Sequence, residues 1–179
     1  GGTLSLGGGD DLHTLHDGAD AGAVDGGAGA DTFNTHIASS AVLGAAIGFE
    51  ALAKSGAGTL TVEGPAVSQF DRVSVDAGTL TIAGGGALLA NGAGFATTVA
   101  SGATLRVDGS FTGSAGADTM TVAGTIAGTG AIALGDGDDV LVLRDGAVLA
   151  NVIDGGLPTA SDSVVLDTAS VLDFDATQT

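Results

Sequence analysis

The sequence predicts an all-β protein with the architecture of a β-solenoid, in which the chain winds into stacked coils of about 20–25 residues. Three observations predict it. Short runs that alternate apolar with small polar residues, rich in Thr and Val, lie between turns that contain Gly, Asp or Asn. One of these runs, Ala57–Val62, returns 20 residues later as Ala77–Ile82. The chain also has 33 Gly and only 3% aromatic residues, which suits a narrow interior filled by aliphatic side chains.

Charge and composition exclude several classes of partner. The net charge of -17 arises from 21 acidic residues against four Lys and Arg, so we expect neither nucleic-acid binding nor attachment to an anionic membrane. The chain has no Cys, which excludes disulfides, a thiol nucleophile and a Cys-based zinc site. The uncharged stretch over residues 77–105 is rich in Gly, Ser and Thr, so we expect no membrane insertion of this segment.

A long internal repeat links the two ends of the chain. Leu6–Ala19 matches Leu134–Ala147, and similar short matches follow each copy. In the second copy, Gly135–Asp139 is predicted to be a turn, Val140–Leu143 the strand that follows it, and Asp145-Gly146 the next turn. The same turn and strand are expected in the first copy.

The segment His36–Ala53 departs from this pattern. It is rich in Ala, and Val42, Ala45, Ala46 and Phe49 have a spacing that a helix would place on one face. Two alternatives follow: a short helix, or a solenoid coil whose interior holds small side chains.

The middle of the chain carries the clearest strands. The two copies at 57–62 and 77–82 have weaker echoes at Ala103–Val107 and Asp118–Val122. An antiparallel β-sandwich would have strands of similar length, but nothing in it would repeat the same turn every 20 residues or so. In stacked coils, apolar columns are expected to form from inward-facing residues that include Leu60, Val62, Leu80, Ile82, Leu105 and Val107.

Several turns combine Gly with Asp. The clearest is Gly26–Asn34, and partial versions lie at 7–11, 113–118 and 135–139; together they resemble the calcium-binding nonapeptide of repeat-in-toxin proteins. Their aspartates lie 20 and 21 residues apart in two pairs, so each pair is expected one coil above another: Asp11 with Asp31, and Asp118 with Asp139. These four are the candidate Ca²⁺ ligands. The alternative is structural, because Asp also accepts turn N–H groups and no two nonapeptides stand in tandem.

The sequence gives little indication of a glycosidase, zinc or serine-nucleophile active site. A glycosidase needs two carboxyl groups at a defined separation, normally beside aromatic platforms, and the six Phe offer few of these. His13 and His16 lie three residues apart on an expected strand and so point to opposite faces, which argues against a joint zinc site. With His36 they are expected to face solvent. No Gly-x-Ser-x-Gly motif is present, and we expect no enzymatic activity and no cofactor other than the calcium alternative.

One part of the sequence resembles a known family. Leu52–Gly64, then Phe70, then Val73–Leu80 resemble the passenger-associated transport repeat of bacterial autotransporters, with Phe70 where tyrosine is usual and Asp71-Arg72 where two small residues are usual. The repeat-like coils span residues 52–82. The residues that carry the resemblance are Lys54, Gly56, Gly58, Leu60, Phe70, Gly78 and Leu80.

The resemblance implies a passenger of type V secretion, folded as a right-handed parallel β-helix on the surface of a Gram-negative bacterium and tethered to its outer membrane. Its role would be that of an adhesin stalk whose transport repeat aids secretion and folding. The implied partners are a host cell-surface or matrix component, or a second copy, and a C-terminal outer-membrane β-barrel of the same polypeptide. Because the chain opens at Gly1 without a signal peptide, we expect residues 1–179 to be one solenoid fragment of a longer passenger.

Overall fold

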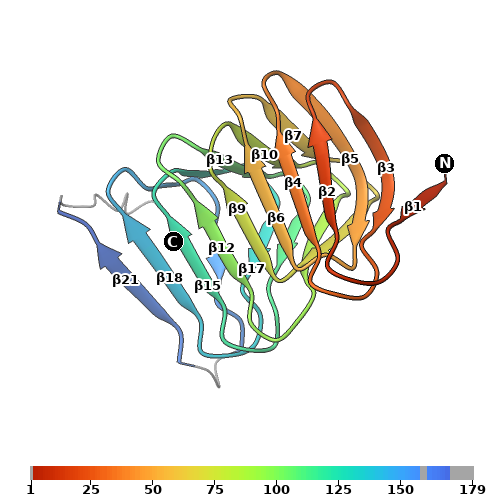
Figure 1. Ribbon diagram of the computed structural model, residues 1–179. Helices are drawn as coiled ribbons and strands as arrows, with labels where there is room; N and C mark the ends of the chain where they lie inside the picture. The colour runs from red at the N-terminus through yellow and green to blue at the C-terminus, as the bar shows by residue number, and fades with distance from the viewer. Residues whose placement is uncertain (1, 158–160, 170–179) are drawn as a thin grey trace.

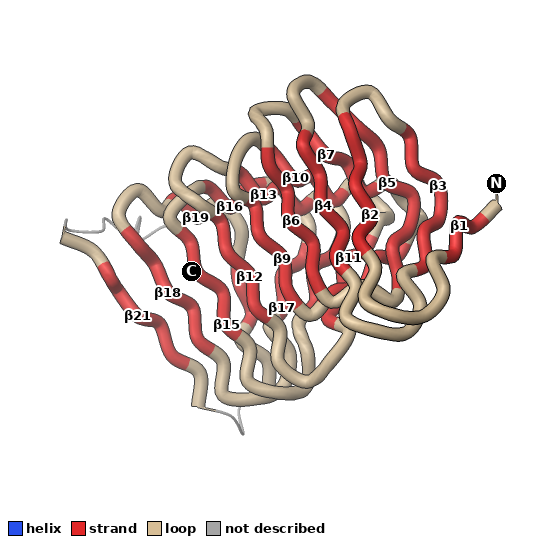
Figure 2. The backbone as a smooth tube through the Cα atoms, in the orientation of Figure 1, coloured by secondary structure: helices blue, strands red, loops and turns tan. Residues whose placement is uncertain are grey.

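The computed structural model describes residues 2–157 and 161–169, and it confirms the predicted β-solenoid. Strands of successive coils pair in parallel, and the coils stack along one axis (Figure 1). The described residues form strands and loops only (Figure 2), so this part of the chain offers no helix that could span a membrane. Side-chain hydrogen bonds between neighbouring coils join residues 18 to 24 apart, close to the expected period.

The first sheet takes one strand from each successive coil. Its strands follow one another along the axis in sequence order, and in β7 and β10 Thr alternates with buried Leu, Val and Ile. The strands are β1 (Thr3–Ser5), β3 (Asp20–Asp25), β5 (Ser40–Ile47), β7 (Thr59–Val62), β10 (Thr79–Ile82), β13 (Thr104–Val107), β16 (Thr125–Ala127) and β19 (Val148–Leu149).

The third sheet runs the full length of the stack on another side. Its register aligns the first residues of neighbouring strands, as in the pair Leu12 and Thr32 and the pair Val140 and Ser163. Its strands are β2 (Leu12–His16), β4 (Thr32–His36), β6 (Ala51–Ser55), β9 (Arg72–Val75), β12 (Ala96–Val99), β15 (Thr119–Val122), β18 (Val140–Arg144) and β21 (Ser163–Asp167). The strand predicted over residues 140–143 is confirmed within β18.

The second sheet is shorter and begins only in the fourth coil, after β7. Its strands are β8 (Val67–Phe70), β11 (Ala87–Ala90), β14 (Ser110–Thr112), β17 (Ala131–Ala133) and β20 (Ile153–Asp154). Beside β8, the neighbouring place in the preceding coil is taken by the end of the long strand β5, where the Ala46 amide donates to Ser68 Oγ at 3.1 Å.

The helix alternative for residues 36–53 is wrong, because the segment forms most of a coil with β5 and β6. Ala41, Leu43 and Ala46 are buried. Along β5 every second residue is buried up to Leu43, and after Gly44 the buried positions shift by one residue. Gly44 lies so close to the preceding coil that an added Cβ would meet Gly22 O at 2.6 Å. The helix-like spacing of apolar residues therefore arises from a strand whose buried positions shift by one residue at Gly44 and Ala45.

The interior consists of stacked aliphatic columns, as predicted. Leu60, Leu80 and Leu105 are cross-strand neighbours and are fully buried, and Val62, Ile82 and Val107 form the parallel column. Burying each such side chain contributes about 1.5–3 kcal/mol. The repeat-like run at 118–122 lies in a different sheet from the runs at 57–62, 77–82 and 103–107. It forms β15 of the third sheet and pairs with β12 and β18.

The residues of the transport-repeat resemblance join two stacked turns. Lys54 is fully buried, and its Nζ donates to Ser55 O at 3.1 Å, to Gly56 O at 2.8 Å and, one coil further on, to Ala77 O at 2.8 Å. Gly56 and Gly78, one in each of the two turns, take φ values of +77° and +65°, a backbone conformation that favours Gly. Burial lowers the pKa of Lys54, and the nearby Asp76 opposes that effect.

Of the other residues of the same resemblance, three belong to the buried core and Gly58 lies against the preceding coil. Leu60, Leu80 and Phe70 are fully buried. An added Cβ on Gly58 would meet Ser39 O at 2.4 Å, so the turn passes directly against the coil below. Both the inward-facing side chains and the turn of this segment are therefore tightly packed.

Candidate functional site

The residue that immediately precedes each strand of the third sheet is acidic in every coil except that of β12, where Phe95 takes the place. These residues form one column, because the strands that they precede are paired in register. The turns before these strands line up along the lower side of the stack in Figure 2. We call this set the acidic column: Asp11, Asp31, Glu50, Asp71, Asp118, Asp139 and Asp162.

Five carboxylates of the column accept a hydrogen bond from a backbone amide of the coil before them: Asp31, Glu50, Asp118, Asp139 and Asp162. The Asp11 amide donates to Asp31 Oδ1 at 2.7 Å, and the Asp31 amide donates in turn to Glu50 Oε2. The Asp118 amide donates to Asp139 Oδ1 at 2.8 Å, and the Asp139 amide to Asp162 Oδ1 at 3.1 Å. The column is therefore a ladder in which acidic side chains tie one coil to the next.

The hydrogen bonding of the second carboxylate oxygen differs between coils. Both oxygens of Asp118 are engaged: Oδ1 accepts from the Phe95 amide and from Ser114 Oγ, and Oδ2 accepts from the Ser114 amide. Asp31 and Asp139 are each 1% exposed, yet their Oδ2 atoms are buried without a hydrogen-bond partner, as is Asp11 Oδ2. A buried carboxylate oxygen without a donor is costly, so it favours either a bound proton or a cation.

Glycine makes room for these carboxylates. An added Cβ on Gly26 would lie 2.9 Å from Asp31 Oδ2 and 2.2 Å from Gly48 O. An added Cβ on Gly113 would likewise meet Leu134 O and Asp118 Oδ2. The first Gly of these Gly-and-Asp turns therefore admits the aspartate that stands five residues later.

Two members of the column, Asp139 and Asp71, have a raised pKa. Burial raises the pKa of Asp139, and the charges of Asp118 and Asp162 add to the effect against the opposing hydrogen bond from the Asp118 amide. Burial also raises the pKa of Asp71, with a further contribution from Glu50. Stacked carboxylates thus resist simultaneous ionisation.

The predicted calcium ligands occupy this column, in two separate places. Asp11 lies beside Asp31 and Asp118 lies beside Asp139, one coil above another as expected, while Glu50, Asp71 and Phe95 separate the two pairs. Across the described residues, no three His, Asp or Glu side chains converge in a way that would hold a metal ion. A cation here would therefore require turn carbonyl oxygens among its ligands.

Sequence reasoning missed three members of the column. Glu50, Asp71 and Asp162 precede strands, but none of them ends a Gly-x-Asp turn of the expected form. The signal that identifies them is an acidic residue directly before a strand, recurring at the coil period.

The histidines divide between the two faces of the third sheet. His13 and His16 point to opposite faces, as predicted, but the expectation that all three face solvent is wrong for His13. Its ring lies 4.8 Å from that of Phe33, at the end of an aromatic stack, and partial burial lowers its pKa. His16 and His36 are exposed.

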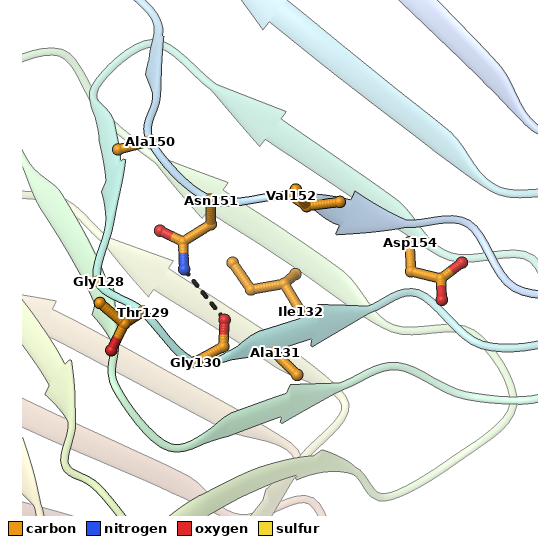
Figure 3. Close-up of a pocket in the computed structure, with 9 residues that line it drawn as sticks. All are labelled: Gly128, Thr129, Gly130, Ala131, Ile132, Ala150, Asn151, Val152 and Asp154. Carbon is orange, nitrogen blue, oxygen red and sulfur yellow. Dashed lines mark hydrogen bonds between the residues drawn. The ribbon is translucent and has the colours of Figure 1, made fainter. Parts of the chain in front are cut away.

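A hollow of about 480 Å³ lies at the corner of the last described coils (Figure 3). Its described lining comes from β17, β20 and the turns that lead into them, and Asp154 is the one ionisable residue among these described residues. Asn151 is 7% exposed and donates through Nδ2 to Gly130 O at 3.2 Å, while its Oδ1 has no hydrogen-bond partner.

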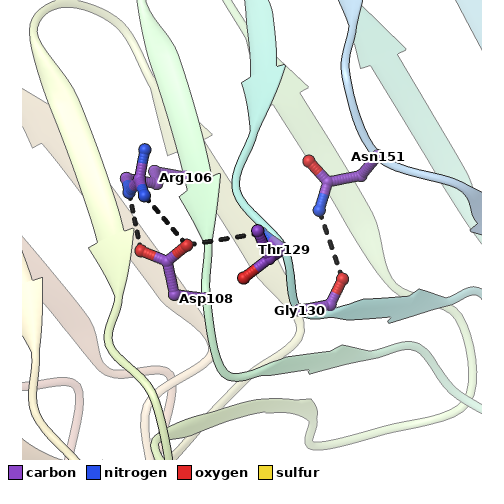
Figure 4. Close-up of polar contacts among 5 residues, drawn as sticks. All are labelled: Arg106, Asp108, Thr129, Gly130 and Asn151. Carbon is purple, nitrogen blue, oxygen red and sulfur yellow. Dashed lines mark hydrogen bonds and ion pairs between the residues drawn. The ribbon is translucent and has the colours of Figure 1, made fainter.

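The polar contacts around this corner link coil to coil. The Asp108 carboxylate pairs with Arg106 Nε at 2.6 Å and accepts from the Thr129 amide of the next coil at 3.3 Å (Figure 4). The bond from Asn151 to Gly130 makes the same kind of link one coil further on. These groups are engaged in holding turns, which is a structural role.

Comparison with known proteins adds no family. No protein-family model matches the chain, and no curated protein or solved structure matches it significantly.

Proposed function

We propose that the chain is a non-enzymatic, extracellular module of a Gram-negative autotransporter adhesin, where it acts as a stalk and adhesion scaffold and aids secretion and folding of the passenger. The observation that carries the proposal is the continuous parallel stacking of the third sheet from β2 to β21. Such a stack lengthens with each coil and holds whatever it carries at a fixed distance. Its partners would be a host surface component, a second copy, and the outer-membrane β-barrel of its own polypeptide.

The buried lysine supports the folding role. Lys54 Nζ joins the turn of its own coil to Ala77 O of the next, so a newly formed coil completes the hydrogen bonding of the coil before it. Coil-by-coil growth can thereby proceed outside the cell without an external energy source, because each added coil buries further apolar surface.

Two deletions that preserve register separate the folding role from the stalk role. Arg72 pairs with Ala51, so deletion of residues 51–71 of the surface-displayed polypeptide removes one coil and brings equivalent positions together. Deletion of residues 119–139 does the same elsewhere, because Thr119 pairs with Val140. Surface protein is measured by antibody labelling of intact cells, with total protein from the same cells as the reference.

We expect deletion of residues 51–71 to lower surface display several-fold and deletion of residues 119–139 to leave it near normal. Equal display of both variants would contradict a transport role for residues 52–82. A folded, displayed protein whose adhesion to host cells does not change when the whole solenoid is removed would contradict the adhesin role.

Calcium binding is a second candidate, favoured by the buried, unpartnered Oδ2 atoms of Asp11, Asp31 and Asp139. A divalent ion beside these atoms would replace the missing donors and reduce repulsion along the acidic column. In this alternative the chain is a β-roll module that Ca²⁺ orders outside the cell.

Circular dichroism and thermal melting in EGTA and then in millimolar Ca²⁺ test this candidate. We expect Ca²⁺ to raise the melting temperature of the natural chain, and Asp31→Asn to reduce that increase. The matched control is Asp136→Asn, which removes one exposed carboxylate from a similar turn. Identical spectra and melting temperatures in both buffers would exclude the calcium function.

A further inference from the structure

Two histidines lie side by side on the outer face of the third sheet. His16 ends β2 and His36 ends β4, and the two residues are direct cross-strand partners in a parallel register. Registered residues of parallel strands project from the same face, about 4.8 Å apart along the axis. Both side chains are exposed, so both imidazoles are available to a solute.

Hydrogen bonds fix the tautomer of His36. Ser55 Oγ donates its single hydrogen to Thr35 O at 2.6 Å, so toward His36 it can only accept. His36 Nδ1 lies 3.2 Å from that oxygen, and therefore carries the ring hydrogen. The lone pair of the neutral ring then lies on Nε2, which is oriented by a hydrogen-bonded partner as in protein metal sites.

We propose that His16 and His36 bind a borderline transition-metal ion such as Zn²⁺, Ni²⁺ or Cu²⁺, with His36 Nε2 as one ligand and a nitrogen of His16 as the other. Imidazole nitrogen suits these ions and does not suit Ca²⁺ or Mg²⁺, which prefer oxygen. Because no third His, Asp or Glu converges with another two anywhere in the described chain, water completes the coordination and the ion exchanges readily.

The surroundings favour a cation without competing for it. The nearest acidic residue in sequence, Asp17, uses Oδ1 to accept from the Ser39 and Ser40 amides at 2.7 and 3.0 Å, so that oxygen holds a turn. The net charge of -17 raises the concentration of cations near the surface. Asp11 and Asp31 lie at the other end of β2 and β4, about 16 Å away by strand length, so this site is separate from the acidic column and does not depend on the proposed function.

Calorimetric titration of the tag-free chain with Zn²⁺, repeated with Ni²⁺, tests the proposal. We expect one ion per chain, and a loss of affinity of about tenfold or more in both His16→Gln and His36→Gln. The matched control is His13→Gln, which removes the inward-facing histidine of the same strand and should bind as the natural chain does. A large excess of Ca²⁺ should not displace the ion.

Ser55 is a positioning residue in this proposal. Ser55→Ala should weaken binding by about 10-fold, and Ser55→Thr, which keeps the hydroxyl, should restore it. Unchanged binding in His16→Gln or His36→Gln, or displacement by Ca²⁺, would assign the ion to carboxylates and overturn the proposal. Circular dichroism spectra equal to those of the natural chain establish that each variant is folded.

Discussion

Replacement of Lys54 by Met should destabilise the solenoid locally, because the lysine completes two turns. Gly56 O and Ala77 O each receive a hydrogen bond from Nζ at 2.8 Å, while Ser55 O also accepts from the Ile37 amide at 3.0 Å. A buried acceptor left without its donor lowers the free energy of unfolding by about 1–3 kcal/mol, so two such carbonyls lower it by about 2–6 kcal/mol. Met offsets part of this loss, since it no longer requires burial of an ammonium group. We therefore expect a net destabilisation of about 3 kcal/mol.

Urea denaturation measures this change, and native-state hydrogen exchange locates it. The affected amides should be those of the turns before β7 and β10, with smaller effects several coils away. Arg72→Met is the matched control, because it removes an exposed cation from the adjacent coil without disturbing the interior. Stabilities of Lys54→Met and Arg72→Met within about 0.5 kcal/mol of each other would refute the assigned role of the lysine.

Three further predictions concern packing and protonation. Leu105→Ala removes a fully buried column member and should cost about 2–5 kcal/mol by urea denaturation, and a cost under about 1 kcal/mol would contradict the packing described. Gly58→Ala should cost about 2 kcal/mol or more because its Cβ would meet backbone, whereas Gly84→Ala, with open space around it, should be nearly neutral. The raised pKa of Asp139 means that folded chains bind its proton more tightly than unfolded ones, so its contribution to stability is greatest below about pH 4 and is lost as pH rises through the folded-state pKa. Melting temperatures between pH 4 and pH 8 should therefore depend less on pH in Asp139→Asn than in the natural chain, and an equal dependence would contradict the raised pKa.

The repeated strands were the predictable part of this fold. Leu60 and Leu80 stand in identical contexts 20 residues apart, and that identity predicts both the coil length and the buried column. The second sheet was not predictable in the same way, because its strands are short and differ in sequence. The segment over residues 36–53 shows the same limit: a strand that changes phase over Gly and Ala has the residue spacing of a helix.

The acidic column was predictable only in part, for a physical reason. Asp11 and Asp31 follow glycines in recognisable turns, so their stacking could be inferred from spacing. Glu50 joins the same column through a longer side chain and follows Phe49, which leaves no turn motif to detect. The pairing of His16 with His36 depends on the register of β2 and β4, so it can be recognised only when the two coils are aligned.

The parallel stacking has a mechanical consequence. Hydrogen bonds between coils run along the solenoid axis, so a force applied to the ends loads one coil boundary at a time instead of shearing a whole sheet. Each coil that detaches would release about 20 residues, or about 70 Å of extended chain. The molecule would then lengthen under tension in steps of one coil while the remaining coils stay folded, which lets it absorb a sudden pull without losing the rest of its structure.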